Sequence, residues 1–177
     1  MKVLITTCAI SLLFSIFTLF QYDSNQYIKW QERIKWEADN ASDAAALYYD
    51  VEEFSKGIKV FNKSEGNKAA EYVLKNNLDP DGNGIIHKRY LNEKFDFYIY
   101  YFDGTGTMTA YKENTRLKEE PFEFPYRFVE PLTGYEKMIY EATAIVTIDA
   151  GTFDYRLSFI EDPQIIRTSG YEYVNSQ

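Results

Sequence analysis

The chain lacks most of the residues from which catalytic and metal sites are usually built. Among 177 residues it has one histidine, His87, and one cysteine, Cys8. A lone histidine without a nearby cysteine or second histidine cannot form a zinc site or a Cys-His nucleophile, so His87 is expected to be a solvated surface residue. The sequence has no nucleophile elbow, phosphate-binding loop or dinucleotide fingerprint. We therefore expect a protein that is not an enzyme.

Positive charge is also scarce. The 19 lysines and arginines are outnumbered by 27 aspartates and glutamates, which gives a formal net charge of −8. Binding to nucleic-acid phosphates requires clustered lysines and arginines, and the sequence has no such cluster, so nucleic acid is not an expected partner. Because no cysteine follows Cys8, the rest of the chain is suited to an oxidising exterior without using disulfides.

A long hydrophobic run is the clearest feature that is present. Residues 3–20 carry no charge, and at roughly 1.5 Å per residue this run spans about 27 Å, enough to cross the hydrocarbon core of a bilayer. A signal peptide would need small residues at the −1 and −3 positions of a cleavage site, and residues 17–22 offer no such pair. We expect residues 1–25 to be an uncleaved anchor that contacts membrane lipid through residues 3–20. Lipidation at Cys8 is the less favoured alternative, because Thr7 is bulkier than the small residue of a lipobox.

The orientation of this anchor is set by the charges that flank it. Lys2 precedes the run, whereas Lys29, Arg33 and Lys35 follow it, and this count alone slightly favours a cytoplasmic body. However, an N-terminus of two residues is easily left inside, and the first downstream positive charge lies two helical turns beyond Phe20. Together with the absence of cysteine from the body, this predicts a single-pass membrane protein with an extracellular body.

A helical pattern continues after the anchor. From residue 26 to about Gly57 there is neither proline nor glycine, and one face repeats at steps of four and three residues, as an amphipathic helix does. We call this face the interaction seam; it consists of Ile34, Ala38, Ala41, Ala45 and Tyr48. Its alanines predict close packing, either on the protein's own sheet or on a neighbouring subunit. A second, shorter helix is predicted from an N-cap at Ser64 to Asn76-Asn77.

The pattern changes to that of strands after residue 79. Alternation from Phe95 to Phe102, a turn at residues 103–106 and a return over residues 107–113 predict a β-hairpin. A second hairpin is predicted from residues 141–149 and 153–160, with a last strand over residues 164–174. The predicted fold class is α+β: an N-terminal transmembrane helix that continues into a long helix packed on a small antiparallel β-sheet. The expected segments are the anchor (1–25), a helical stalk with the second helix (26–78) and an antiparallel β domain (79–177).

The turn between helix and sheet contains a possible calcium loop. Asp79, Asp81 and Asn83 occupy positions 1, 3 and 5, Gly84 occupies position 6, and an apolar residue occupies position 8 in this interpretation. The twelfth residue is Tyr90 rather than the glutamate that an EF-hand loop requires. Any calcium site here would therefore be weak and structural. The alternative is a turn in which aspartate, asparagine and glycine serve backbone conformation alone.

Residues 118–134 contain three prolines, Pro121, Pro125 and Pro131, with aromatic side chains between them. Proline cannot donate to a β-ladder, so this stretch is predicted to be a loop or an edge crossing the sheet. Its aromatic residues either cover the sheet, which is the favoured interpretation, or form an exposed ridge for a partner.

The segment Glu37 to Leu47, which reads EADNASDAAAL, follows the anchor by about twenty residues. It resembles the helix pattern of Tad (tight adherence, Flp) pilus assembly proteins of the TadE/TadG type, which carry a similar alanine-rich run after their anchor. The resemblance covers residues 1–75. It does not extend to prepilin processing, because the glycine followed by a glutamate five residues on is missing before the apolar run. Nor does it include the β-rich part.

The resemblance implies a non-enzymatic minor pilin or pseudopilin-like subunit of a bacterial pilus or secretion apparatus, with other pilin-like or assembly proteins as partners. The alternative is a monomeric, membrane-tethered extracellular binding domain for a peptide, glycan or protein partner. The two hypotheses differ at the anchor. A filament subunit needs complementary helix faces, whereas a tethered binder tolerates any other anchor in its place.

Overall fold

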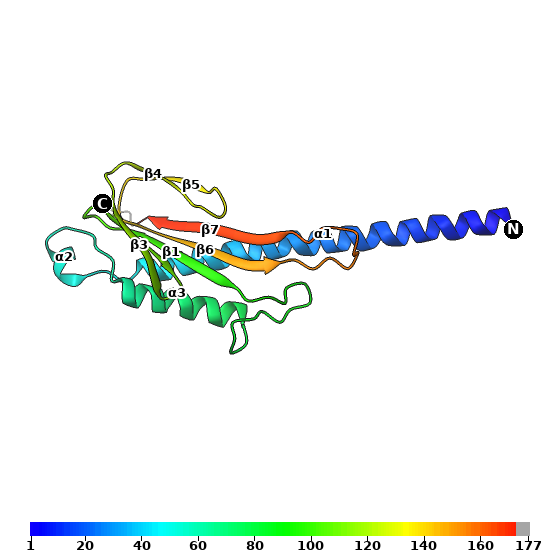
Figure 1. The fold of residues 1–177 in the computed structure, drawn as a ribbon, viewed down its shortest axis with the longest axis horizontal. Helices are drawn as coiled ribbons and strands as arrows, with labels where there is room; N and C mark the ends of the chain where they lie inside the picture. Colours follow the sequence, from blue (N-terminus) through cyan, green and yellow to red (C-terminus); the bar gives the residue numbers. More distant parts are fainter. Residues whose placement is uncertain (173–177) are drawn as a thin grey trace.

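A single long helix connects an isolated apolar rod to a packed body (Figure 1). The computed structural model describes residues 1–172, and α1 (Lys2–Ala46) accounts for a quarter of the chain. Its N-terminal part protrudes alone, and none of its most apolar 18-residue stretch is buried. Among the described residues, α1 is the one helix that is long and apolar enough to cross a membrane. The prediction that the apolar run and the amphipathic stretch form one continuous helix is confirmed.

The helical region ends earlier than its composition predicts. α1 stops at Ala46 instead of continuing to Gly57, because the chain turns there and Tyr49 forms a β-bridge with Phe61. The short helix α2 (Val51–Ser55) is capped by Asp50, whose carboxylate accepts the backbone N–H groups of residues 52 and 53. α3 (Lys63–Leu78) follows, and its N-cap is Asn62 rather than the predicted Ser64.

The β-strands form a five-stranded antiparallel sheet and a separate two-stranded hairpin. The large sheet has the order β3-β2-β1-β6-β7. Its strands are β1 (Asp96–Phe102), β2 (Thr107–Lys112), β3 (Thr115–Pro121), β6 (Thr143–Thr152) and β7 (Gln164–Glu172). The hairpin pairs β4 (Tyr126–Val129) with β5 (Glu136–Ile139). The α+β fold class, with a long helix on an antiparallel sheet, is therefore confirmed.

The strand predictions are correct for the first hairpin and wrong for the second. β1 and β2 pair as expected. The predicted strand over residues 153–160 is absent: these residues form a loop, and β6 pairs instead with β7. The last predicted strand begins at the observed residue, and its end at Val174 lies outside the described residues. β3, β4 and β5 are not predicted: residues 118–134 are expected to form a loop or an edge crossing the sheet, and they contain the end of β3 and all of β4. Nearly all side chains of β3 are exposed, so it shows no apolar alternation that would predict a strand.

The large sheet lies between two hydrophobic layers. On one face, Phe97, Ile99 and Tyr101 of β1 pack with the buried stripe of α1 and with α3. On the other face, Tyr100 and Phe102 pack with residues of the β4–β5 hairpin. Because both faces are covered, the central strands β1 and β6 are buried along most of their length.

The two long helices approach each other closely over this sheet. At Gly66 of α3, an added Cβ would lie 2.8 Å from the carbonyl oxygen of Ala45 and 2.5 Å from the hydroxyl of Tyr101. Tyr101 itself is fully buried and its hydroxyl donates to the side chain of Asn67, 3.0 Å away. The small residues of α1 and α3 therefore set the spacing between helices and sheet.

Candidate functional site

The interaction seam lies inside the body rather than on its surface. Ile34, Ala38, Ala41 and Ala45 are each 0% exposed and belong to the core formed by α1, α3 and the sheet. The fifth predicted member, Tyr48, lies beyond the end of α1 and is 45% exposed, so its inclusion in the seam is wrong. The physical reason is the turn after Ala46, which removes Tyr48 from the helical periodicity. These four residues are buried by contacts within the same chain.

Polar contacts hold the same helix in place along its length. The amide of Asn77 donates to Glu37, 2.6 Å away, and Arg33 donates to the backbone carbonyl of Asn77 at 2.7 Å, which joins α1 to α3. The Ser169 hydroxyl of β7 hydrogen-bonds the carboxylate of Asp39. The packed half of α1 is therefore fixed to both α3 and the sheet.

The predicted calcium loop is folded as a turn closed by its own aspartate. Oδ1 of Asp81 accepts the backbone N–H groups of Asn83 (2.8 Å) and Ile85 (2.9 Å), while Oδ2 lies 3.1 Å from Nε2 of His87. These contacts, led by the Ile85 backbone hydrogen bond, lower the pKa of Asp81 to about 2. In turn, the Asp81 carboxylate raises the pKa of His87. Both carboxylate oxygens of Asp81 are thus already engaged.

The other members of that loop do not converge on Asp81. Asp79 adopts a left-handed backbone conformation at the end of α3, and its exposed carboxylate pairs with Lys88 at 3.4 Å. Tyr90, the twelfth residue of the loop, is 5% exposed and stacks on Phe153 with ring centroids 5.0 Å apart. In residues 1–172, no group of three or more His, Cys, Asp or Glu side chains is arranged to hold a metal ion. The geometry favours the turn over the calcium site.

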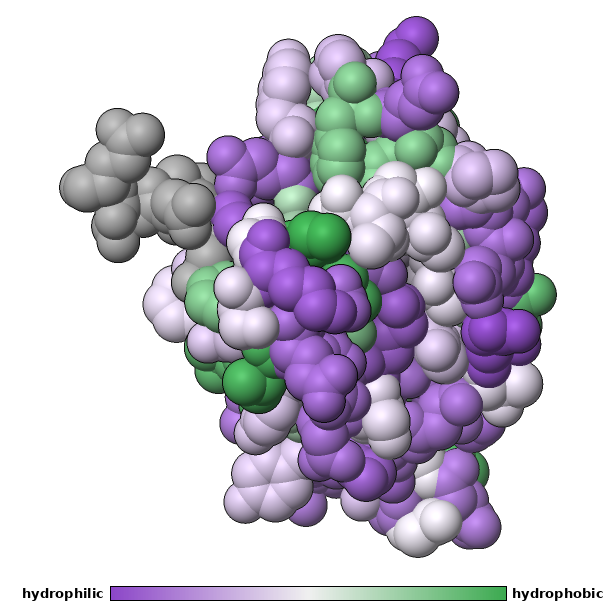
Figure 2. Space-filling model, turned by 90° about the vertical axis from the view of Figure 1, so that its left-hand side faces the viewer, coloured by the Kyte–Doolittle hydropathy of each residue, from purple (hydrophilic) through white to green (hydrophobic). Residues whose placement is uncertain are grey.

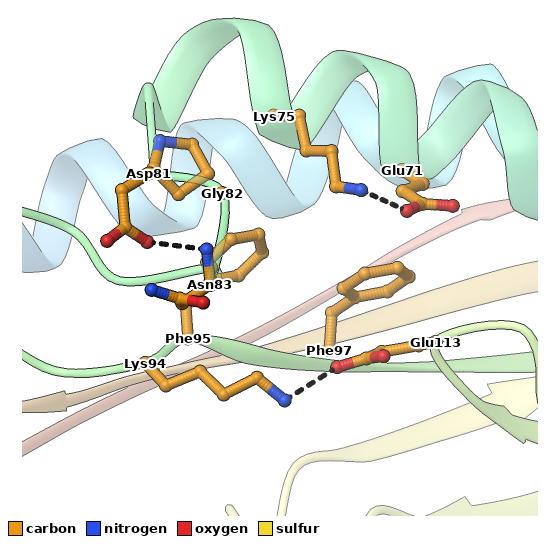
Figure 3. A pocket seen from close by; sticks show the side chains of 11 residues that line it. Glu71, Lys75, Asp81, Gly82, Asn83, Lys94, Phe95, Phe97 and Glu113 are labelled. Atoms are coloured by element: carbon orange, nitrogen blue, oxygen red, sulfur yellow. Dashed lines mark hydrogen bonds and ion pairs between the residues drawn. The ribbon is translucent and has the colours of Figure 1, made fainter.

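A hollow of about 400 Å³ lies beside this turn, between α3 and the start of β1 (Figure 3). Two ion pairs lie along its walls: Lys75 with Glu71 at 2.5 Å, both on α3, and Lys94 with Glu113 at 3.3 Å. The Lys75 hydrogen bond lowers the pKa of Glu71 despite partial burial. Phe97 lies between these pairs but is only 2% exposed. The hollow is therefore lined by ion-paired side chains and offers no large apolar surface.

The turn geometry gives a testable expectation about calcium. Millimolar calcium should leave the melting temperature of the full-length protein in detergent unchanged, whereas Asp81→Ala should lower it equally with and without calcium, because two backbone N–H groups lose their acceptor. The matched control is Asp79→Asn, which removes a carboxylate of the predicted calcium site while asparagine tolerates the left-handed conformation. This variant should melt close to the wild type. A rise in melting temperature with calcium that Asp79→Asn abolishes would instead establish the calcium loop.

The proline-aromatic stretch covers the sheet face opposite the helices. Phe122 and Phe128 pack against Phe102 of β1, with ring centroids 5.4 Å and 5.1 Å apart. Both are less than one-tenth exposed. The buried carboxylate of Glu130 accepts the Tyr100 hydroxyl at 3.1 Å and the backbone N–H of Thr133 at 2.7 Å, which fastens the hairpin to the sheet. The structure thus supports the covering role of this stretch over an exposed ridge.

The end of the body farthest from the N-terminus is mainly hydrophilic (Figure 2). Green apolar patches on this face are small and separated by purple residues. Exposed apolar side chains do occur around the end of α1, where Leu47 is 72% and Val51 is 75% exposed. Isolated residues of this kind are normal on protein surfaces. This face offers no single large hydrophobic docking patch.

The comparisons with known proteins were made for the whole chain. No family model, curated protein or solved structure matches it.

Two features that sequence reasoning missed lie on α1. The first is its exposed face within the body, where Ile28 is 51% and Trp36 is 72% exposed. The second is an ion pair at the base of the body, between Asp23 and Arg156. The Asp23 side chain is fully buried, and its Oδ1 accepts a hydrogen bond from Nε of Arg156 at 2.8 Å and lies 2.6 Å from Nη2. Exposed apolar residues on a helix could have signalled the first, but nothing in the sequence pairs residues 133 positions apart.

Proposed function

We propose that this chain is a non-enzymatic, single-pass membrane protein whose body is extracellular, and that it acts as a minor pilin or pseudopilin-like subunit of a bacterial pilus or secretion apparatus. The observation that carries the proposal is the rigid connection between anchor and body. The apolar run ends at Phe20, and the side chain of Asp23 is already buried in the body on the same uninterrupted helix. No flexible linker separates the two parts.

A rigid connection matters for assembly more than for tethering. A tethered binding domain gains reach from a flexible linker. A subunit of an ordered assembly instead needs its membrane helix and its body at a fixed relative position, because both must meet neighbouring copies at once. The continuous helix α1, packed on its own sheet along one half and bare along the other, supplies that fixed geometry (Figure 1).

The faces of α1 also indicate which surface a neighbour would contact. The alanine seam is buried within the chain, so it is not available to a partner. Trp36 and Ile28 face away from the core on the same helix, and the bare residues of the anchor continue below them. We infer that the subunit contact consists of the apolar anchor together with Ile28 and Trp36. Tryptophan is among the residues that most often dominate protein interfaces.

The proposal predicts crosslinks from the exposed face of α1. A photoreactive amino acid at Trp36 should give adducts with a second copy or with another membrane protein in the membranes of cells that make the protein. The matched control is Tyr72 on α3, an aromatic residue that is 68% exposed outside this face. Replacing residues 3–20 by an unrelated leucine-alanine span should abolish the Trp36 adducts. Adducts that survive this replacement, or a monomer without adducts, would support the tethered binding domain instead.

The side of the membrane on which the body lies is determined in the same cells. Protease added to intact protoplasts should remove the chain beyond about residue 25, because the body is proposed to lie outside. Full protection of the body, with digestion only after the membrane is opened, would place it in the cytoplasm and contradict the extracellular part of the proposal.

A further inference from the structure

The loop between β6 and β7, residues 153–163, is the part of the body that reaches furthest towards the protruding end of α1 (Figure 1). The sequence predicts a strand over residues 153–160, whereas the structure has a loop there that packs against the helix. It meets α1 where the apolar run ends. The position of this loop relative to the bilayer is therefore fixed by the position of the anchor.

Specific contacts fasten the loop to the end of the anchor. The ring of Tyr155 stacks on that of Phe20 with centroids 6.5 Å apart. The guanidinium of Arg156 lies 4.9 Å from the centre of the Tyr22 ring and forms the ion pair with Asp23. The backbone N–H of Arg156 also donates to Asp23, at 3.2 Å. These three partners on α1, Phe20, Tyr22 and Asp23, all lie at the end of the apolar run or within three residues of it.

The same loop carries a large apolar side chain that is exposed to solvent. Phe159 is 74% exposed, among the most exposed aromatic residues of the body. The charges around it are partly engaged within the protein: Asp162 accepts the backbone N–H of Tyr155 at 2.8 Å, and Arg156 is held by Asp23. The loop therefore offers an aromatic tip beside paired charges.

We propose that residues 155–160 form a membrane collar, in which Phe159 enters the headgroup region of the bilayer beside the point where α1 emerges. The inference rests on the proposed membrane anchor. Since residues 3–20 span the hydrocarbon core, any segment packed on residues 20–23 lies at the level of the headgroups. Tyrosine and tryptophan concentrate at this level in membrane proteins, and phenylalanine is common on the buried face of segments that lie in the interface. Tyr22 and Tyr155 supply tyrosines where α1 emerges, and Phe159 adds an exposed aromatic side chain on the same loop.

The collar would attach by its aromatic residues and not by charge. Asp154 and Glu161 add negative charge to the loop, and the whole chain has a net charge of −8. Anionic lipids therefore give it no advantage. A second point of contact beside the helix would limit rotation and tilt of the body, so that the exposed face of α1 with Trp36 is presented at a constant height and angle.

Spin labels in phosphatidylcholine nanodiscs test the collar on the full-length chain. Cys8 is the only cysteine, so Cys8→Ser gives a clean background for a nitroxide at Ser158→Cys, next to the intact Phe159. Collisions of this label with oxygen should exceed those with a water-soluble nickel complex. A label at Val51→Cys, in α2 at the opposite end of the body, should show the reverse preference. Anionic lipid should not increase the oxygen preference at residue 158.

A substitution then tests the role of Phe159 itself. Phe159→Asp should abolish the oxygen preference of the label at residue 158, whereas Val51→Asp should leave it unchanged. The two positions are matched, because Phe159 is 74% and Val51 is 75% exposed, and neither change is expected to disturb folding. A label at residue 158 that behaves like the label at residue 51 would overturn the collar.

A label on the native Cys8 separates the two proposals. Cys8 lies within the apolar run, so its label should be shielded from the nickel complex if α1 spans the bilayer. A shielded label at Cys8 with a water-accessible label at residue 158 rejects the collar and keeps the anchor. A water-accessible label at Cys8 rejects the anchor, and the collar with it.

Discussion

Arg156→Met is expected to destabilise the folded body by about 3 kcal/mol at neutral pH, because it leaves the carboxylate of Asp23 buried without a cation. The Asp23 side chain is 0% exposed and that of Arg156 is 31% exposed. Methionine keeps much of the apolar length of arginine, so the loss reports the charge and its hydrogen bonds more than the packing. Urea unfolding of the full-length protein in detergent, followed by circular dichroism, measures the effect.

The size of this effect depends on pH in a direction that identifies its cause. In the wild type, burial would raise the pKa of Asp23, but the hydrogen bonds and charge of Arg156 outweigh burial and lower it. This carboxyl therefore stabilises the wild type above its unfolded pKa of about 3.9, and the contribution is lost as the pH falls below that value. In Arg156→Met the charge and the side-chain hydrogen bonds of the guanidinium are lost, while the backbone N–H of residue 156 still donates to the carboxylate. Burial then weighs more, so the folded pKa of Asp23 is higher than in the wild type, and the variant loses less stability than the wild type as the pH falls. The gap between the two proteins should shrink from pH 7 to pH 4.

Two further variants distinguish this buried pair from an ordinary surface pair. Arg127→Met removes the ion pair with Glu136, whose side chains are 66% and 53% exposed, and should cost under about 1 kcal/mol without the same pH trend. Adding Asp23→Asn to Arg156→Met removes the uncompensated charge and should recover part of the lost stability. Equal losses for Arg156→Met and Arg127→Met would mean that the pair at the base of the body is solvated and contributes little.

The helical part of the fold could be predicted from sequence because its signal is periodic. The recurrence of Ile34, Ala38, Ala41 and Ala45 corresponds to one face of a helix, and all four are buried. The end of α1 could not be predicted in this way, since residues 47–56 contain neither glycine nor proline. The break there comes from tertiary structure, namely the bridge from Tyr49 to Phe61 and the cap at Asp50.

The strands show the same division between local and distant causes. Alternation identified β1 and β2, where one set of side chains faces the helices and the other faces the hairpin. The exposed edge strand β3 has no such alternation, so its place in the sheet depends on its backbone pairing with β2 alone. The pairing of β6 with β7 across a loop of eleven residues, and the contact of that loop with Asp23, join segments whose local sequences carry no signal for each other.

The seam illustrates how structure changes a functional interpretation. From the sequence, an alanine face could serve either the protein's own sheet or a neighbouring subunit. The structure places it against the sheet and α3 and leaves Ile28 and Trp36 exposed, where the subunit contact is proposed. Substitutions on the two faces of this helix should therefore affect two different properties of the protein. Changes to the seam should affect the stability of each chain, and changes at Trp36 should affect contacts between chains.

Ala41→Leu is expected to destabilise the body by roughly 1 to 3 kcal/mol, because the added isopropyl group has no space between α1, α3 and the sheet. Ala41 is 0% exposed, and the contact of Gly66 with Ala45 one turn further along shows how little the helices can separate. The matched control is Asn40→Leu. Asn40 directly precedes Ala41 and is exposed on the same helix, so this change should alter stability by less than about 0.5 kcal/mol. Urea unfolding in detergent measures both variants.

Crosslinking in membranes completes the comparison between the two faces. Trp36→Ala should keep the urea midpoint of the wild type, since its side chain is 72% exposed, but it should weaken contacts between subunits in the membrane. Contacts in this variant are followed with the photoreactive group at Ile28, on the same exposed face. If Ala41→Leu keeps full stability but loses its crosslinks, the alanine seam serves neighbouring subunits, and the assignment of the two faces must be reversed. If Ala41→Leu loses neither, the packing of α1 on the sheet is looser than the burial of Ala41 indicates.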